Sequence, residues 1–289
     1  MLHAGYPFEP EQFWDKFVLL KLKERNSDMD DWVLILGCST GHGGASTRKL
    51  AENGCGIIGF HFDRGEIKKE AEAFCEELNG VNDGRTHFFN KNAAAPEVMD
   101  EFIPKIQEIT EGRPLKLLLH SIAFGTTTNF FGDKPVTQKQ MEMTVHVMGT
   151  SLLYWVQKLY DAGLLAQGSR IIGLTSEGNY LAMEGYGPVS VAKVALESIT
   201  RQIGWELGQY GITANCIQAG VTPTRALTKI SENWREWVEK TQVRNPMQRT
   251  TQPEDVANVV YLMLQPEADF INCSIIYNDG GEHRSGIFG

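Results

Sequence analysis

A short apolar run, followed at once by a glycine-rich turn and a helical pattern, constrains this chain more than any other feature. The run is Trp32–Leu36, and an amphipathic helical pattern resumes beyond the turn. The turn carries Gly37, Gly41 and Gly43 in the order G-x3-G-x-G. Missing β-carbons at these positions permit tight turning and let a diphosphate approach the backbone N–H groups of a helix N-terminus. The segment therefore predicts a dinucleotide-binding unit, although this motif alone leaves a purely structural turn open.

Strand and helix patterns alternate along the rest of the chain. Further apolar runs that predict strands lie at 56–62, 86–89, 116–120, 170–175 and 213–217, with amphipathic stretches between them. Such alternation produces a parallel sheet covered on both faces. We therefore expect an α/β fold with a single Rossmann-like, doubly wound parallel sheet in residues 32–289. Residues 1–31 form an N-terminal extension, in which Phe13, Trp14, Phe17, Val18 and Leu20 indicate an amphipathic helix.

Composition narrows the possible functions. The 289 residues contain no linker, repeat or low-complexity run, which favours one domain beyond the extension. The net charge of -9 opposes a general role in binding nucleic acid or anionic membrane. The five cysteines are scattered without metal-ligand spacing, and no stretch of 18 apolar residues occurs. We expect a soluble, cytoplasmic protein with reduced cysteines, no metal site and no membrane or nucleic-acid partner.

The end of the second predicted strand gives conflicting indications about the cofactor. Asp63 stands where an acidic side chain would bind the adenosine ribose hydroxyls, and its neighbour Arg64 could bind a 2′-phosphate. His61 lies at a position where an acidic side chain that distinguishes NADH from NADPH is common. These residues favour NADH slightly over NADPH, and a solvated strand end explains Asp63 equally well.

Tyr186 and Lys193 lie seven positions apart in the segment Tyr-Gly-Pro-Val-Ser-Val-Ala-Lys. On a helix this offset is close to two turns, so both side chains share one face and can share a site. Val189, four places before the lysine, can neither donate nor accept a proton. A phenol and an ammonium placed together can stabilise negative charge that develops on a substrate oxygen. The pair alone also fits a half-buried aromatic beside a surface cation.

Several motifs together resemble the short-chain dehydrogenase/reductase superfamily, and within it the enoyl-acyl carrier protein (enoyl-ACP) reductases. They are His120-Ser-Ile-Ala-Phe124, Tyr186-x6-Lys193, Asn215-Cys-Ile-Gln-Ala-Gly220 with Thr224, and Asn278-Asp-Gly-Gly281. Ordinary members of the superfamily place tyrosine four residues before lysine, whereas enoyl reductases have the longer spacing found here. The resemblance extends from about Trp32 to Gly281. It implies hydride transfer from a reduced nicotinamide cofactor to the β-carbon of an enoyl thioester.

The resemblance also implies a role for each matching residue. Tyr186 would hydrogen-bond the thioester carbonyl or its enolate, and Lys193 would hold the nicotinamide ribose and add positive charge. A second active-site tyrosine of the family is replaced by Ser176, and either Ser176 or Tyr180 could take over its role. The residues expected to bind the cofactor are Gly37, Gly41, Gly43, Asp63, Arg64, Asn90, Ser121, Ile122, Ala123, Lys193, Gly220, Thr222 and Thr224.

Beyond Thr224 the family has a helical lid over the acyl chain. Here residues 225–243 supply Ile230, Trp234, Trp237 and Val238 at roughly helical spacing, which predicts a small helical substrate lid with an apolar inner face. An ordinary surface helix is the alternative.

The resemblance further implies a homotetramer that acts in fatty acid synthesis on a substrate carried by acyl carrier protein or coenzyme A. Two other functions stay open on sequence grounds. One is a carbonyl or imine reductase with a divergent site, which Ser176 favours and Val189 opposes. The other is a cofactor-binding paralogue that has lost catalysis.

Overall fold

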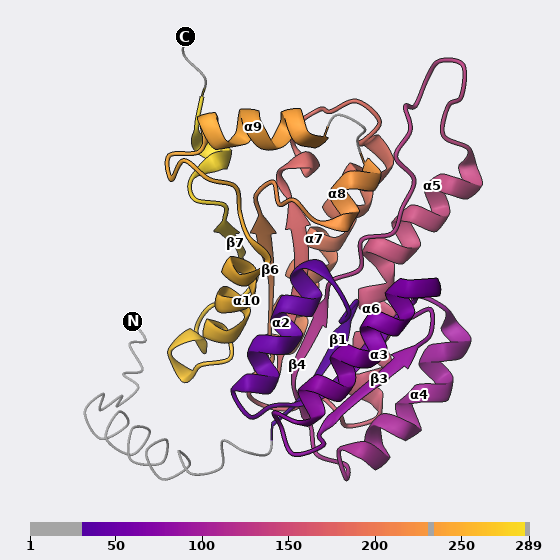
Figure 1. The fold of residues 1–289 in the computed structure, drawn as a ribbon. Coiled ribbons are helices and arrows are strands. Elements are labelled where there is room, and N and C mark those ends of the chain that lie inside the picture. Colours follow the sequence, from indigo (N-terminus) through magenta and orange to yellow (C-terminus); the bar gives the residue numbers. More distant parts are fainter. Residues whose placement is uncertain (1–30, 231–233, 287–289) are drawn as a thin grey trace, which may run out of the picture.

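Strands and helices alternate along the chain in the computed structural model, which describes residues 31–230 and 234–286 (Figure 1). The strands are β1 (Trp32–Leu36), β2 (Gly56–His61), β3 (Thr86–Asn90), β4 (Leu115–His120), β5 (Arg170–Ser176), β6 (Thr213–Ala219) and β7 (Ile275–Asn278). The helices are α2 (Gly41–Glu52), α3 (Gly65–Asn79), α4 (Pro96–Ile109), α5 (Gln138–Val145), α6 (Ser151–Asp161), α7 (Gly187–Leu207), α8 (Arg225–Ile230), α9 (Trp234–Arg244) and α10 (Pro253–Leu262). A π-helical turn (His146–Thr150) joins α5 to α6.

In the described residues these strands form one seven-stranded sheet in the order β3-β2-β1-β4-β5-β6-β7, with every neighbouring pair parallel. The order reverses direction beside β1, because the chain first builds outward through β2 and β3 and then returns to add β4. In open sheets of this kind, ligands bind outside the carboxyl ends of the strands at such a switch point. The candidate site therefore belongs at the carboxyl ends of β1 and β4.

Alternate residues of β1 enter separate cores on the two faces of the sheet. Leu34 and Leu36 belong to a core that includes side chains of α4, α6 and α7. Val33 and Ile35 belong to a second core that includes side chains of α2 and α10. Because successive strand residues point to opposite faces, a strand that is apolar throughout is expected between two helical layers. This agrees with the sequence-based expectation of a doubly wound sheet.

The predicted strands agree with the observed ones to within two residues at each end, and β7 is an additional edge strand. The predicted lid region contains two short helices, α8 and α9, which lie beyond the carboxyl ends of the strands (Figure 1). The side chains of Trp234, Trp237 and Val238 are partly buried there, whereas the side chain of Ile230 lies outside the described part. The predicted helix in the N-terminal extension also falls outside it.

Each of the five cysteines is free, and Cys38, Cys55 and Cys216 are buried. In the part of the chain that the structure describes, no helix has both the length and the apolarity needed to cross a membrane.

The core on the α6 face depends on Trp155. Its side chain is fully buried, and its Nε1 donates a 2.7 Å hydrogen bond to the Ala93 carbonyl oxygen. Trp155→Ala should lower the free energy of unfolding by about 3–5 kcal/mol, because it removes apolar contacts and leaves a cavity. Urea denaturation measures this change. Trp205→Ala is the matched control, since Trp205 is 75% exposed and should change stability by no more than about 0.5 kcal/mol. Equal losses in the two variants would contradict this account of the core.

Candidate active site

The glycine turn between β1 and α2 forms a cradle of bare backbone. A β-carbon on Gly43 would lie 1.7 Å from the Gly37 carbonyl oxygen, and one on Gly37 would lie 2.6 Å from the Ser121 carbonyl oxygen. Gly37 and Gly41 also have φ angles of 94° and 58°, which side chains disfavour. The turn thus requires glycine, and no side-chain cap bonds to the first N–H groups of α2 at the switch point. Such a cradle fits the diphosphate of a nicotinamide dinucleotide.

Three other residues predicted to line the cofactor, Thr224, Ser121 and Ile122, lie close to this turn. Thr224 lies above Gly41, with its Cγ2 3.6 Å from the position of a β-carbon there. Ser121 and Ile122, at the end of β4, are half-buried, whereas Ala123 is exposed. Two further predicted positions, Gly220 and Thr222, follow β6: Thr222 is buried and its hydroxyl donates to the Gly220 carbonyl oxygen.

At the end of β2, Asp63 is held firmly. Its Oδ2 accepts a 2.6 Å hydrogen bond from the Ser39 hydroxyl and lies 2.9 Å from His61 Nδ1. Asn90 bonds to the backbone of Asp63 through both its side-chain oxygen and its nitrogen. Arg64 is exposed, with its guanidinium carbon 5.6 Å from the centre of the Phe62 ring. Asn90 therefore orients the acidic residue, and the Asp63 carboxylate is fixed in position at the end of β2.

Tyr186 does not lie within a helix as the sequence pattern predicts. It is the residue that caps the N-terminus of α7, and Pro188 stands in the first turn of that helix. The phenol is buried, and its oxygen lies 2.8 Å from the Ser176 hydroxyl at the end of β5. Burial raises the pKa of Tyr186 above its ordinary value. The phenol therefore stays protonated at neutral pH and can act as a hydrogen-bond donor.

Lys193 lies two turns into α7 and is also buried. Its Nζ donates a 2.6 Å hydrogen bond to the Leu174 carbonyl oxygen, on the same strand as Ser176. Burial lowers the pKa of Lys193 to about 8. An ammonium has three donors, so Lys193 can bond to further groups while this bond holds it against β5.

Ser176 and Tyr180, the two candidates for a second active-site hydroxyl, lie in different surroundings. Ser176 contacts the Tyr186 phenol directly. Tyr180 is 51% exposed, and its hydroxyl accepts a 3.1 Å hydrogen bond from Gln218 Nε2 on β6. Of the two, Ser176 is the one that the structure brings to Tyr186.

Sequence reasoning missed a buried charged cluster behind Ser176. Arg244 is the last residue of α9. Its Nη2 lies 2.6 Å from a carboxylate oxygen of Glu177 and 2.7 Å from a carboxylate oxygen of Glu282. The second oxygen of each carboxylate is buried without a protein partner among the described residues. Burial and the nearby Glu177 raise the pKa of Glu282 to about 7. The cluster joins the end of β5, the lid region and the C-terminal segment, and no local sequence signal links these three positions.

Comparison with known proteins agrees with this geometry. A family model described as Enoyl-(Acyl carrier protein) reductase matches residues 37–283, which is most of the chain. The protein therefore belongs to this family of short-chain dehydrogenases/reductases, and it is an oxidoreductase of that class. The family and the glycine cradle together support binding of a nicotinamide dinucleotide.

The individual relatives include proteins named for two different reductions. An enoyl-[acyl-carrier-protein] reductase [NADH] of Aquifex aeolicus is 25% identical over 66% of this chain and 71% of its own length. A 3-oxoacyl-[acyl-carrier-protein] reductase of the same organism is 24% identical over 86% of this chain and 95% of its own. A crystal structure of an enoyl-(acyl-carrier-protein) reductase from Anaplasma phagocytophilum in complex with NAD has a TM-score of 0.76 at 19% identity, and covers 90% of this chain and 94% of that one. That likeness concerns the fold alone.

The Glu282 carboxyl should make stability depend on pH. Its pKa is about 7 in the folded protein and near its ordinary value of 4.5 in the unfolded chain. Between pH 4.5 and pH 7 the folded state therefore keeps a proton that the unfolded state releases. The resulting stabilisation of the folded state is complete below pH 4.5 and is lost as the pH rises through 7. Glu282→Gln should remove this dependence, so that the wild type loses about 2 kcal/mol relative to the variant between pH 5 and pH 8.

Urea denaturation at the two pH values measures the difference. Glu267→Gln, at an exposed glutamate, is the control and should follow the wild type at both pH values. A constant offset between Glu282→Gln and the wild type would show that Glu282 does not titrate in this range.

Proposed function

We propose that this protein is an enoyl-thioester reductase, which adds hydride to the β-carbon of a trans-2-enoyl thioester. The observation that carries the proposal is the seven-residue offset of Tyr186 and Lys193 with apolar, buried Val189 in the intervening position. Reduction of a carbonyl develops charge on the oxygen of the attacked carbon. Reduction of the enoyl group develops it on an oxygen two carbons farther from the point of attack. A displaced phenol suits the second case, because donors help only where charge develops.

In this proposal, different residues of the chain bind the cofactor and the substrate oxygen. When bound, reduced nicotinamide supplies the hydride. Gly37, Gly41 and Gly43 would hold its diphosphate, while Lys193 would hold its ribose. Tyr186 donates its hydroxyl proton as a hydrogen bond to the thioester oxygen, which becomes negatively charged as the enolate forms. Solvent or a relay then protonates the α-carbon.

Carbonyl reduction is the second candidate, and one contact favours it. The 2.8 Å pairing of Ser176 with Tyr186 gives two hydroxyls that could both meet a ketone oxygen. The similarity to a 3-oxoacyl-[acyl-carrier-protein] reductase points in the same direction. A catalytically weakened paralogue is less well supported, because Tyr186 and Lys193 are both buried beside β5.

The substrate's carrier and the assembly belong to the same proposal. The proposed substrate is an acyl group carried by acyl carrier protein or coenzyme A. The proposed assembly is a homotetramer, and the proposed pathway is fatty acid synthesis. The exposed side chains of α9 include Arg235 and Lys240 together with Glu236 and Glu239, so they offer little net positive charge to an acidic carrier. We therefore expect only a modest preference for carrier protein over coenzyme A.

The two candidate reactions can be separated with matched substrates. Oxidation of NADH and NADPH should be followed with a trans-2-enoyl-CoA and with the 3-oxoacyl-CoA of equal length. We expect turnover of the enoyl thioester, with kcat reduced by about 10²–10³ in Tyr186→Phe, because one donor to the developing charge is lost. Tyr210→Phe is the control, since that tyrosine is half-exposed beyond the end of α7.

Ser176→Ala and Tyr180→Phe complete the design. If enoyl reduction is the reaction, Ser176→Ala should cost much less than Tyr186→Phe. Turnover of the 3-oxoacyl substrate alone, abolished by Ser176→Ala, would replace the proposal with carbonyl reduction. A loss in Tyr180→Phe as large as that in Tyr186→Phe would assign the second hydroxyl to Tyr180.

Cofactor choice gives a separate prediction. We expect tighter binding of NADH than of NADPH, because the fixed Asp63 carboxylate accepts ribose hydroxyls and repels a 2′-phosphate. Titration of the protein's fluorescence with each nucleotide measures both Kd values, and Asp63→Asn should narrow their ratio. Tighter binding of NADPH than of NADH, lost in Arg64→Ala, would show that the exposed Arg64 guanidinium sets the cofactor preference instead of Asp63.

A further inference from the structure

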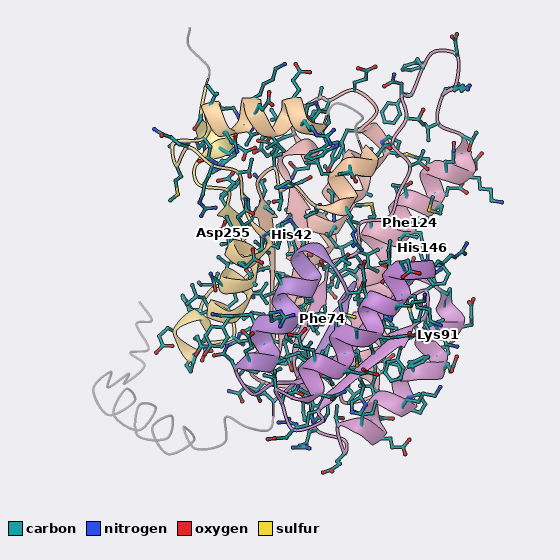
Figure 2. All side chains as sticks on the ribbon, viewed as in Figure 1. His42, Phe74, Lys91, Phe124, His146 and Asp255 are labelled. Atoms are coloured by element: carbon teal, nitrogen blue, oxygen red, sulfur yellow. The ribbon has the colours of Figure 1, made fainter. Side chains whose placement is uncertain are left out.

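His42 stands in the middle of the glycine turn, between Gly41 and Gly43 and in the first turn of α2. Figure 2 shows it at the end of α2 that faces the carboxyl ends of the strands. Its ring atom Nδ1 is buried and has no hydrogen-bond partner among the described residues. A buried polar atom left unpaired costs about 1–3 kcal/mol, so such an atom indicates a missing ligand or water.

Lys193 is the charged group that acts on the His42 ring, and three other charged side chains at this edge of the sheet have partners of their own. Lys193, from α7, is near enough to act on it electrostatically and itself donates to Leu174. Asp63, from the end of β2, is bound by Ser39, and Asp255, at the start of α10, is paired with Arg249. Arg225, at the start of α8, is paired with Glu70 on α3.

We propose that His42 binds the diphosphate of the nicotinamide dinucleotide through Nδ1 and takes up a proton as the dinucleotide binds. The inference rests on dinucleotide binding at the glycine turn, and it holds whether the enzyme reduces enoyl or carbonyl groups. A diphosphate at the N-terminus of α2 lies against the residue that forms this turn. Its oxygens are hydrogen-bond acceptors, so they match a protonated Nδ1.

The expected charge change follows from the surroundings. Burial and, secondarily, Lys193 lower the pKa of His42 to about 4, so the ring is neutral at pH 7 without cofactor. Two negative charges on the diphosphate favour the protonated ring and raise this pKa in the complex. The complex therefore binds a proton that the free protein lacks, and the affinity must fall as pH rises through the interval between the two pKa values.

ADP-ribose is the most direct probe, because it carries the diphosphate without the nicotinamide ring. Calorimetric titrations at pH 6, in buffers with different ionisation enthalpies, count the protons taken up on binding. We expect a substantial fraction of one proton for the wild type and close to none for His42→Gln. We also expect the wild-type affinity to fall by about threefold to tenfold between pH 5.5 and pH 7.5, and the variant to lose most of this slope.

His87→Gln is the matched control. His87 is a partly buried histidine of β3 that stacks on Trp32 at 5.8 Å, and burial likewise lowers its pKa. This variant should keep the full proton uptake of the wild type. Thermal unfolding of each variant checks that it is folded.

NMR titration of the wild-type histidine rings gives a second readout that needs no folded variant. The pKa of His42 should rise by about two units when ADP-ribose is added, which is the rise that the expected fall in affinity requires. An unchanged pKa, or equal proton uptake in His42→Gln and the wild type, would overturn the proposal and leave water as the partner of Nδ1. Proton uptake with NAD but none with ADP-ribose would also overturn it, because the ring would then respond to the nicotinamide half.

Discussion

The contact between the Gly43 backbone and the Gly37 carbonyl is the constraint on which the rest of the site depends. With only 1.7 Å available to a β-carbon, the chain closes the turn so tightly that α2 starts directly beyond β1. The Gly37 backbone meets Ser121 in the same way, which joins the end of β1 to the end of β4. The anion-binding surface at the switch point is therefore made of backbone N–H groups, which keep their positions without side-chain rotamers.

A second constraint connects the end of β5 to the end of α9. Ser176, which meets the Tyr186 phenol, is followed directly by Glu177, and Arg244 binds that carboxylate at the end of α9. Glu282 shares the same guanidinium nitrogen. Removing one member of such a buried set leaves an uncompensated charge, so the ends of β5 and α9 are held together energetically. The position of Ser176 thus depends on residues far away in sequence.

The sequence predicted the fold well because its signals are local. Continuous apolar runs and the glycine spacing reflect strand burial and turn geometry, so the predicted strands agree with β1 to β6 to within two residues. The site was predicted less completely. Motif matching proposed Ser176, Tyr186 and Lys193 as candidates, but it could not choose between Ser176 and Tyr180, since that choice depends on which hydroxyl the folded chain directs at the phenol.

Two other features had no readable signal. The Arg244 cluster unites three segments that are remote in sequence, and charged residues there look like ordinary surface positions. His42 is a single residue within a glycine motif, and only the fold shows that its Nδ1 is buried and unpaired. Both depend on desolvation, which is a property of tertiary structure and not of spacing.

The division of the relatives between enoyl and 3-oxoacyl reductases has a physical counterpart in this site. In both reactions hydride adds to the β-carbon, but the negative charge develops on the 3-oxo oxygen in one and on the thioester oxygen in the other. These two oxygens belong to carbons that lie two positions apart along the acyl chain. Tyr186, at the cap of α7, and Lys193, tied to Leu174, are fixed to the sheet and cannot follow that displacement. In the proposed function, the position of this fixed phenol relative to the attacked carbon therefore favours enoyl reduction over carbonyl reduction.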